Sequence, residues 1–160
     1  MSSRIGLTEA PPGPGAVVRS PTPALSEPVR RFLGELRFAA LASIDPDGSP
    51  HQAVLWYRLE PDDRILVNSA VGRRWPANLE RDPRVSLSIE DGYAWVGLAG
   101  VVDEIDHDWD RSHADINALA RLYHADEPAT AERLIGGRFA SQERVSFRIR
   151  ITRVHDHLED

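Results

Sequence analysis

A helical spacing of apolar residues opens the regular part of the chain. Between residues 27 and 36 apolar side chains recur every three or four positions, which predicts a short helix: Val29, Phe32, Leu33 and Leu36. Ser26 stands directly before this run, where its hydroxyl is suited to cap the first helical turn. The first regular element is therefore a capped amphipathic helix.

From residue 38 the period falls to two, which is typical of half-buried strands. We predict strands at 38–45, 50–60, 64–69, 85–90, 93–105 and 145–152. The run Asp45-Pro46-Asp47-Gly48 joins the first two strands as a tight turn. Most of these strands follow one another closely enough to form antiparallel hairpins.

Helices are predicted where the alternation stops. One covers 72–82, with Pro76 at an early helical position. Two more cover 110–125 and 128–135, and Gly136-Gly137 is expected to end the second of them. About six antiparallel strands with short helices between them predict a mainly β fold, a small barrel with helical decoration.

Residues 1–24 differ in composition from the rest of the chain. They contain five prolines and three glycines, and such a segment cannot bury enough apolar surface to offset the entropy of ordering it. We predict a flexible arm over 1–24 and a single barrel domain over 25–160, which is a usual length for one domain.

Charge and hydropathy narrow the possible partners. The chain has 19 basic and 25 acidic side chains and a formal net charge of −6, which argues against nucleic acid or an anionic membrane as a partner. No segment reaches the roughly 18 apolar residues that a membrane span needs. The first residues also lack the apolar run of a secretory signal. A cytoplasmic protein is therefore expected.

Missing residue types narrow the chemistry. The chain has no cysteine, which excludes disulfides, thiolate nucleophiles and cysteine-ligated metals. All 19 basic residues are arginine, so a lysine Schiff base is excluded as well. The histidines and aspartates between residues 107 and 115 favour helix capping over metal ligation, and no metal site is expected.

The segment Asn68–Arg84, NSAVGRRWPANLERDPR, carries the clearest chemical signal. A strand ends at its start, Gly72 permits a tight turn, and a helix begins with Arg73 and Arg74. Helix N-termini present free backbone N–H groups and the positive end of the dipole, and arginines add charge-assisted hydrogen bonds to an anion. The pattern predicts a phosphate or carboxylate pocket beside the barrel wall; the alternative is an exposed helix start with two surface arginines.

Three stretches together resemble a known family. They are FAALASIDPDGSPHQAVLWYRL (38–59), ILVNSAVGRRWPANLERDPRVSLSI (65–89) and RVSFRIRITRV (144–154). Their order and spacing resemble the flavin and deazaflavin oxidoreductases of the split β-barrel type, which are related to pyridoxamine 5'-phosphate oxidases. The resemblance covers residues 25–155 and is closer to the branch that uses the deazaflavin coenzyme F420. It implies an FMN-binding type of split β-barrel.

The resemblance also implies a homodimer with cofactor pockets at the subunit interface. It places the phosphate-bearing tail of the cofactor on the end of the third strand and the following helix, at Asn68, Ser69, Gly72, Arg73, Arg74, Asn78 and Leu79. It places the ring against the strand that begins at residue 49, near Ser49, Pro50, His51 and Gln52. Trp56 and Tyr57, further along this strand, become wall or substrate-side positions.

One position departs from the family pattern. Many relatives have a phosphate-binding lysine where this chain has Trp75. Two interpretations follow: Trp75 packs on the cofactor ring or its linker while Arg73 and Arg74 hold the phosphate, or cofactor binding is weakened. Loss of one charged contact of roughly 1.5–3 kcal/mol would weaken affinity about 10- to 150-fold.

The function implied is hydride transfer from reduced F420 to a small electron-poor substrate, either an enone or a heteroaromatic. Tyr57 is a candidate for the proton donor. Two alternatives stay open: an FMN-dependent oxidoreductase, and a non-catalytic carrier of F420 or flavin. Arg148 and Arg150 alternate with apolar residues and are expected on a solvated face, or in contact with the partner subunit's cofactor tail.

Overall fold

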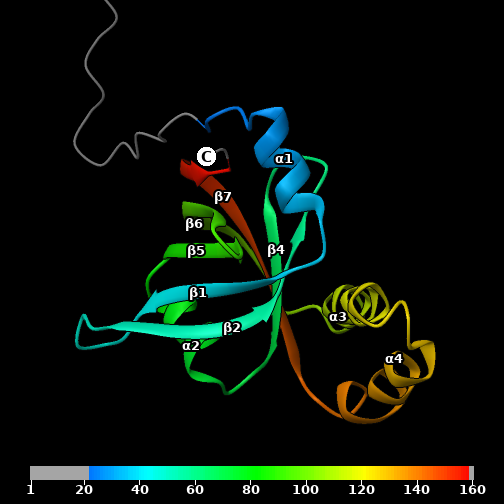
Figure 1. The fold of residues 1–160 in the computed structure, drawn as a ribbon. Coiled ribbons are helices and arrows are strands. Elements are labelled where there is room, and N and C mark those ends of the chain that lie inside the picture. The colour runs from blue at the N-terminus through cyan, green and yellow to red at the C-terminus, as the bar shows by residue number, and fades with distance from the viewer. Residues whose placement is uncertain (1–21, 159–160) are drawn as a thin grey trace, which may run out of the picture.

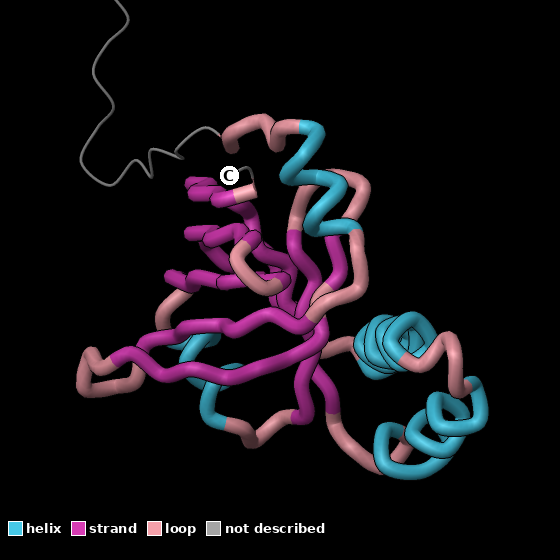
Figure 2. Tube along the Cα trace, in the orientation of Figure 1, coloured by secondary structure: helices cyan, strands magenta, loops and turns pink. Residues whose placement is uncertain are grey.

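One curled antiparallel sheet makes up most of the protein. The computed structural model describes residues 22–158, and the predicted arm over 1–24 lies almost wholly outside them. The sheet has seven strands in the order β2-β1-β5-β6-β7-β4-β3. Figures 1 and 2 show it curling around a central core, with helices at its ends and along one side. The mainly β split-barrel prediction is confirmed.

The bounds of the elements follow the predicted pattern closely. The strands are β1 (Phe38–Ile44), β2 (Pro50–Trp56), β3 (Arg58–Leu59), β4 (Ile65–Ala70), β5 (Arg84–Asp91), β6 (Ala94–Asp106) and β7 (Arg144–His157). The helices are α1 (Glu27–Gly34), α2 (Arg74–Arg81), α3 (Trp109–Tyr123) and α4 (Pro128–Leu134). Ser26 caps α1 as predicted, because its side chain accepts a hydrogen bond from the Val29 N–H. No helix among residues 22–158 is long and apolar enough to cross a membrane.

The predicted strand over 50–60 is in fact two strands, so the sheet has seven strands and not the six that were expected. β2 and β3 lie at opposite edges of the sheet, and Tyr57 alone separates them in the chain. The chain therefore passes from one edge of the curled sheet to the other. The Tyr123 hydroxyl accepts a hydrogen bond from the Tyr57 N–H at 3.1 Å and lies 3.0 Å from the Tyr57 carbonyl oxygen. This hydroxyl is the hydrogen-bond partner of the Tyr57 backbone, which has no neighbouring strand at the break between β2 and β3.

Two apolar clusters organise the molecule. The larger one fills the barrel, and it receives side chains from both α1 and α2 as well as from the strands. The smaller one joins α3, α4 and the following turn: Ile116, Leu119, Ala120, Ala131 and Phe139. Trp56 packs against this second cluster from the barrel side. α3 and α4 are thereby held beside the barrel wall (Figure 1).

The glycine pair after α4 does not end the helical path, contrary to the prediction. A π-helical turn, Ile135–Phe139, continues directly from α4 and includes Gly136 and Gly137. A glycine that stops a helix usually adopts a positive φ, but neither of these glycines is among the residues with positive φ. The turn instead carries Arg138 and Phe139 back towards the barrel.

Candidate functional site

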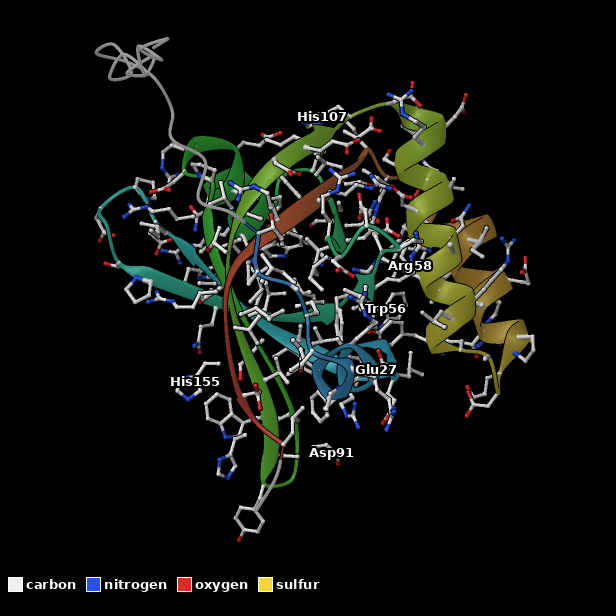
Figure 3. The ribbon with its side chains drawn as sticks, turned by 90° about the horizontal axis from the view of Figure 1, so that it is seen from above. Glu27, Trp56, Arg58, Asp91, His107 and His155 are labelled. Carbon is white, nitrogen blue, oxygen red and sulfur yellow. The ribbon has the colours of Figure 1, made fainter. Side chains whose placement is uncertain are left out.

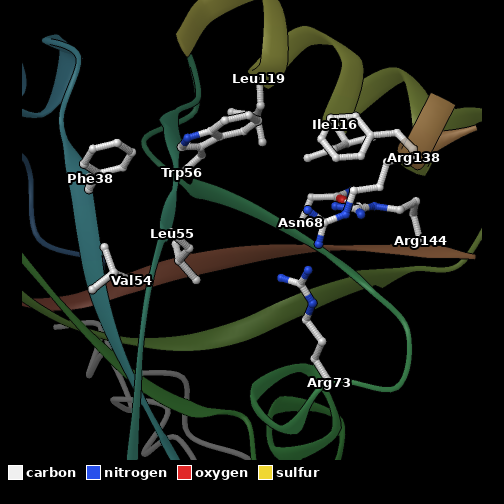
Figure 4. A pocket seen from close by; sticks show the side chains of 11 residues that line it. Phe38, Val54, Leu55, Trp56, Asn68, Arg73, Ile116, Leu119, Arg138 and Arg144 are labelled. Carbon is white, nitrogen blue, oxygen red and sulfur yellow. Dashed lines mark hydrogen bonds between the residues drawn. The ribbon is translucent and has the colours of Figure 1, made fainter. Parts of the chain in front are cut away.

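A cavity of about 280 Å³ lies between the barrel wall, α2 and the α3–α4 unit (Figure 4). Seven apolar side chains line it: Phe38, Val54, Leu55, Trp56, Ile116, Leu119 and Phe139. Four polar side chains lie at its other end: Asn68, Arg73, Arg138 and Arg144. The cavity is therefore apolar at one end and cationic at the other.

Arg144 is the most deeply buried of the three arginines. It begins β7 and is only 4% exposed. Its Nε donates to the Asn68 Oδ1 at 3.0 Å, and one terminal nitrogen donates to the Gln142 Oε1 at 2.6 Å. Its guanidinium also lies over the Phe139 ring, 4.9 Å from the ring centroid. These contacts hold the side chain in place without neutralising its charge.

The charge at this end of the cavity is uncompensated. Within residues 22–158, Arg73, Arg138 and Arg144 form no salt bridge with a carboxylate, although most other arginines there do. Burial, and after it the positive charges of Arg73 and Arg138, lower the pKa of Arg144 to about 10. With this pKa, Arg144 still carries its charge at neutral pH. Three close cations without an acid favour binding of an anion such as phosphate or carboxylate.

Flat aromatic side chains form the opposite end. Of the cavity-lining aromatics, Trp56 stacks on Tyr123 at 5.2 Å and 16°, and Phe38 also stacks on Tyr123 at 5.8 Å. Figure 3 shows Trp56 on the side of the barrel that faces α3. Phe38 and Val54 stand at the mouth of the cavity and are 60% and 74% exposed. Such a wall suits a planar conjugated ring.

Two of the predicted tail-binding residues, Asn68 and Arg73, line the cavity. Gly72 precedes Arg73 and has φ +98°, a left-handed conformation that L side chains rarely adopt. This turn directs the chain from the end of β4 into α2. The structure thus brings Asn68, Arg73 and Arg144 together in the cationic end (Figure 4).

Arg74 and Asn78 serve a different purpose from the predicted one. Arg74 makes two hydrogen bonds to the Asp45 carboxylate, at 3.0 and 2.8 Å. Asn78 donates to the same carboxylate at 2.9 Å and to the Ser43 hydroxyl at 3.0 Å. These hydrogen bonds, Asn78 first and Arg74 after it, hold the pKa of Asp45 below its usual value. Both residues tie α2 to the end of β1 and do not line the cavity.

Three other predicted ligands are buried structural residues. Trp75 is 5% exposed and packs against Phe147, while Leu79 lies in the same barrel core. The Ser69 hydroxyl is buried and donates to the Ala70 carbonyl at 2.9 Å. The Trp75 ring points into the barrel and not into the cavity, so it is not placed to pack on a cofactor there; weakened cofactor binding stays a prediction.

The residues predicted to meet the cofactor ring lie at an edge of the sheet and do not line the cavity. The Ser49 N–H donates to Asp47 in the turn, and Pro50, His51 and Gln52 pair with β1 in β2. Gln52 lines a second concave surface on the outside of β1, β5 and β6, together with Trp95 and His155. The later residues of the same strand, Val54–Trp56, are the ones that line the cavity.

The proposed proton donor is a core residue. Tyr57 is 2% exposed, and its hydroxyl donates to the Leu33 carbonyl at 2.9 Å inside the barrel. Burial raises the pKa of this hydroxyl far above its ordinary value. The structure therefore places Tyr57 away from the cavity and removes the reason for assigning it a catalytic role.

The sequence pattern predicts no role for Arg138 and Arg144, which line the cavity, and it places Arg148 and Arg150 on a solvated face or at the partner subunit's cofactor tail. Arg148 forms ion pairs with Glu60 and Asp115 at 3.3 Å; its side chain is 18% exposed and does not line the cavity. One sequence signal pointed to Arg144: it is the first residue of the closing strand, and the structure pairs it with Ala70 at the end of β4. Nothing in the sequence indicates that Arg138 reaches the cavity, because Gly136-Gly137 before it predict a helix end and not the π-helical turn that carries it.

The expected capping role of the acidic residues before α3 is confirmed for Asp108, whose carboxylate accepts from the Arg111 N–H at 2.9 Å. In the part of the chain that the structure describes, no three His, Asp or Glu side chains are grouped so that they could hold a metal ion.

Comparison with known proteins adds two kinds of finding. A family model described as pyridoxamine 5'-phosphate oxidase matches residues 25–158. Among solved structures, a protein named F420 reductase has a TM-score of 0.65 and 22% identity, over 82% of this chain and 98% of that one. A conserved hypothetical protein from Mycobacterium tuberculosis has a TM-score of 0.64 and 24% identity, over 86% of this chain and 87% of that one.

A third solved structure with this fold is that of a heme storage protein. The heme storage protein HutZ from Vibrio cholerae has a TM-score of 0.61 and 20% identity, over 81% of this chain and 93% of that one. No curated protein matches the sequence. At these identities the structural likenesses establish a shared fold alone.

Proposed function

This chain belongs to the pyridoxamine 5'-phosphate oxidase family, and from that premise we propose that it is an oxidoreductase that depends on a flavin-type cofactor. The preferred cofactor is the deazaflavin F420, and FMN is the alternative. The observation that carries the proposal is the cationic end of the cavity, where Arg73, Arg138 and Arg144 have no carboxylate partner among the described residues. A second support is the aromatic wall opposite them.

The two ends of the cavity match the two parts of such a cofactor. The arginines would hold its phosphate by charge-assisted hydrogen bonds, and Trp56 with its apolar neighbours would lie beside the ring and exclude water. When bound in reduced form, the ring supplies the hydride. The protein's own contribution is then orientation and electrostatics, with a small electron-poor molecule as substrate.

F420 is preferred because a protein named F420 reductase shares the fold over nearly its whole length. FMN has the same two parts, a flat ring and a phosphate, and is therefore the alternative. A non-catalytic carrier of either cofactor is a further alternative, since no acid or base has been identified in the cavity; steady-state turnover separates a carrier from an enzyme.

A homodimer is part of the proposal. Phe38 and Val54 leave a large apolar surface exposed at the mouth of the cavity, and β2 is an edge strand. A second copy that covers this mouth would bury the apolar surface. It would also bring the cavity close to residues from the other protomer.

The proposal is tested by titrating the purified protein with F420 and, separately, with FMN, while ring fluorescence is followed. We expect micromolar or tighter binding of F420 and weakening of at least about tenfold in Arg144→Gln, because one charged hydrogen bond contributes roughly 1.5–3 kcal/mol. Arg121→Gln is the matched control, since Arg121 is exposed and pairs with Glu132 on the far side of α3 and α4.

The outcomes separate the candidates. Preference for FMN with the same loss in Arg144→Gln assigns the flavin alternative. Equal loss in Arg121→Gln shows a general effect of charge, and absence of binding by either cofactor overturns the proposed function.

A further inference from the structure

We propose that Asp115 is a positioning residue for the anion site: through Ser146 and Asn68 it holds Arg144 in place while leaving the charge of that arginine free for a phosphate or carboxylate. This inference rests on the proposed function for the identity of the natural ligand. The relay itself is built entirely from residues of this chain.

The relay is a continuous chain of short hydrogen bonds. Ser146 Oγ donates to the Asp115 Oδ2 at 2.7 Å, and Asn68 Nδ2 donates to Ser146 Oγ at 2.9 Å. Arg144 Nε then donates to the Asn68 Oδ1 at 3.0 Å. Ser146 is fully buried and Asn68 is 9% exposed, so water competes little for these bonds.

The orientation of the Asn68 amide is determined by chemistry. Its Nδ2 also faces the Ser112 carbonyl oxygen at 2.9 Å, and a carbonyl can only accept. Arginine can only donate. With the amide reversed, two oxygens would face each other at Ser112 and two donors would face each other at Arg144. The Asn68 oxygen is therefore presented to Arg144, and the direction of the whole relay follows.

Asp115 is itself held from the other side. Arg148 lies 3.3 Å from both of its carboxylate oxygens, and Arg148 also contacts Glu60. The negative charge of Asp115 is thus already paired with Arg148. Its remaining role towards the cavity is to accept the hydrogen bond that the Ser146 hydroxyl donates. The lone pairs of the serine oxygen are then free to accept a hydrogen bond from Asn68.

Two neutral side chains consequently separate the carboxylate from the buried arginine. A carboxylate directly against Arg144 would form a buried ion pair and compete with any incoming anion. The relay supplies the geometric restraint of such a pair without its charge. This arrangement explains how Arg144 can be both ordered and uncompensated.

Asn68→Asp tests the inference most sharply, because it places a carboxylate against Arg144 with almost no change in shape; it also removes the amide donor to the Ser112 carbonyl and to Ser146. Ala129→Glu on the exposed face of α4 is its control, since it adds the same charge elsewhere. Asp115→Asn tests the far end of the relay. Glu132→Gln is the control there, as it removes one exposed carboxylate. Near-UV circular dichroism verifies that each variant is folded.

The first measurement is protection against thermal unfolding by inorganic phosphate at constant ionic strength. The second is the affinity ratio between FMN and riboflavin, or between F420 and its phosphate-free ring analogue. A merely structural role would change ring binding and phosphate binding alike and leave this ratio unmoved. We expect Asn68→Asp to reduce the phosphate affinity and the ratio at least about tenfold. Asp115→Asn reduces them less but in the same direction, while both controls behave as wild type.

The inference is overturned if wild type is not protected by phosphate, or if Asn68→Asp binds phosphate as wild type does. It is also overturned if folded Asp115→Asn keeps the wild-type ratio, which would decide the matter should Asn68→Asp fail to fold. If wild type binds neither ring cofactor but is protected by phosphate in a relay-dependent way, the proposed function fails and the relay stands.

Discussion

At the scale of single residues, arginines that look alike in sequence have different surroundings. Arg144 and Arg148 lie on the same strand and on the same face of it. Arg148 is neutralised by Glu60 and Asp115, whereas the hydrogen-bond and ring partners of Arg144 among the described residues are amides and an aromatic ring. A buried cation without a carboxylate partner lowers the stability of the unliganded protein. In the proposed function, Arg144 is there because it binds the anionic part of the ligand.

Tyr57 gives a prediction at this scale. Tyr57→Phe removes the hydroxyl that donates to the Leu33 carbonyl but leaves the ring in the core. We expect the free energy of unfolding, measured by urea titration, to fall by about 1 kcal/mol, while cofactor affinity stays within twofold of wild type. A loss of turnover of a hundredfold or more, with cofactor affinity unchanged, would instead restore Tyr57 as a proton donor.

At the scale of elements, the start of α2 distributes three consecutive residues to three environments. Arg73 lines the cavity, Arg74 binds Asp45, and Trp75 enters the barrel core. Successive residues of a helix point about 100° apart, so neighbours in sequence face different surroundings. The sequence motif therefore predicts that this segment reaches the cavity, but it does not predict which of the three side chains lines it.

The link between α2 and Asp45 predicts a specific acid sensitivity. Hydrogen bonds from Asn78 and Arg74 hold the pKa of Asp45 below its unfolded value. The ionised carboxylate therefore stabilises the fold above that unfolded value, and the contribution is lost as the pH falls through the lower pKa of the folded state. In Asp45→Asn this contribution is absent at every pH. The gap in unfolding free energy between wild type and variant should therefore narrow as the pH falls below the ordinary aspartate pKa of about 4.

Urea unfolding across that pH range measures the gap. Glu132→Gln, which removes an exposed carboxylate on α4, serves as the comparison for the loss of one negative charge. An unchanged gap between wild type and Asp45→Asn at all pH values would contradict a stabilising role of the ionised Asp45.

At the scale of the whole molecule, the curled sheet separates two surfaces. One carries the cavity, where α3, α4 and the π-helical turn close over β2, β4 and the start of β7. The other is the outer surface of β1, β5 and β6, where Trp95 is stacked with His155 at 5.1 Å; Figure 3 shows His155 well away from α3. The predicted ring-binding residues Pro50–Gln52 begin β2, the strand whose later residues Val54–Trp56 line the cavity, and Gln52 lies on the second surface.

The proposed homodimer gives the prediction at this scale. Val54 is apolar and 74% exposed on the edge strand β2. We expect sedimentation analysis to show a dimer and Val54→Arg to shift it towards monomer, because an unpaired charge would have to be buried in the interface. Ala129→Arg, on the exposed face of α4, is the control and should remain dimeric. A monomeric wild type, or a Val54→Arg protein that stays dimeric, would contradict an interface at the cavity mouth.

Much of this architecture follows from local pattern alone. Period two over the strands, the Ser26 cap and the turn at Asp45–Gly48 were sufficient for a mainly β barrel, because each depends on residues close together in the chain. The break at Tyr57 was not predictable in this way. It depends on Tyr123, which is 66 residues distant and supplies the hydrogen bonds that the interrupted strand needs.

By itself, then, the sequence determined most of the elements and the family, and it predicted the segment from Asn68 to Arg73 as part of an anion site. The tertiary structure decided which arginines remain free for a ligand. Asp45 neutralises Arg74 across 29 positions, while Asn68 holds Arg144 across 76 positions without neutralising it. The availability of a charge depends on what lies within hydrogen-bond distance of it, and those neighbours come together only when distant strands and helices pack.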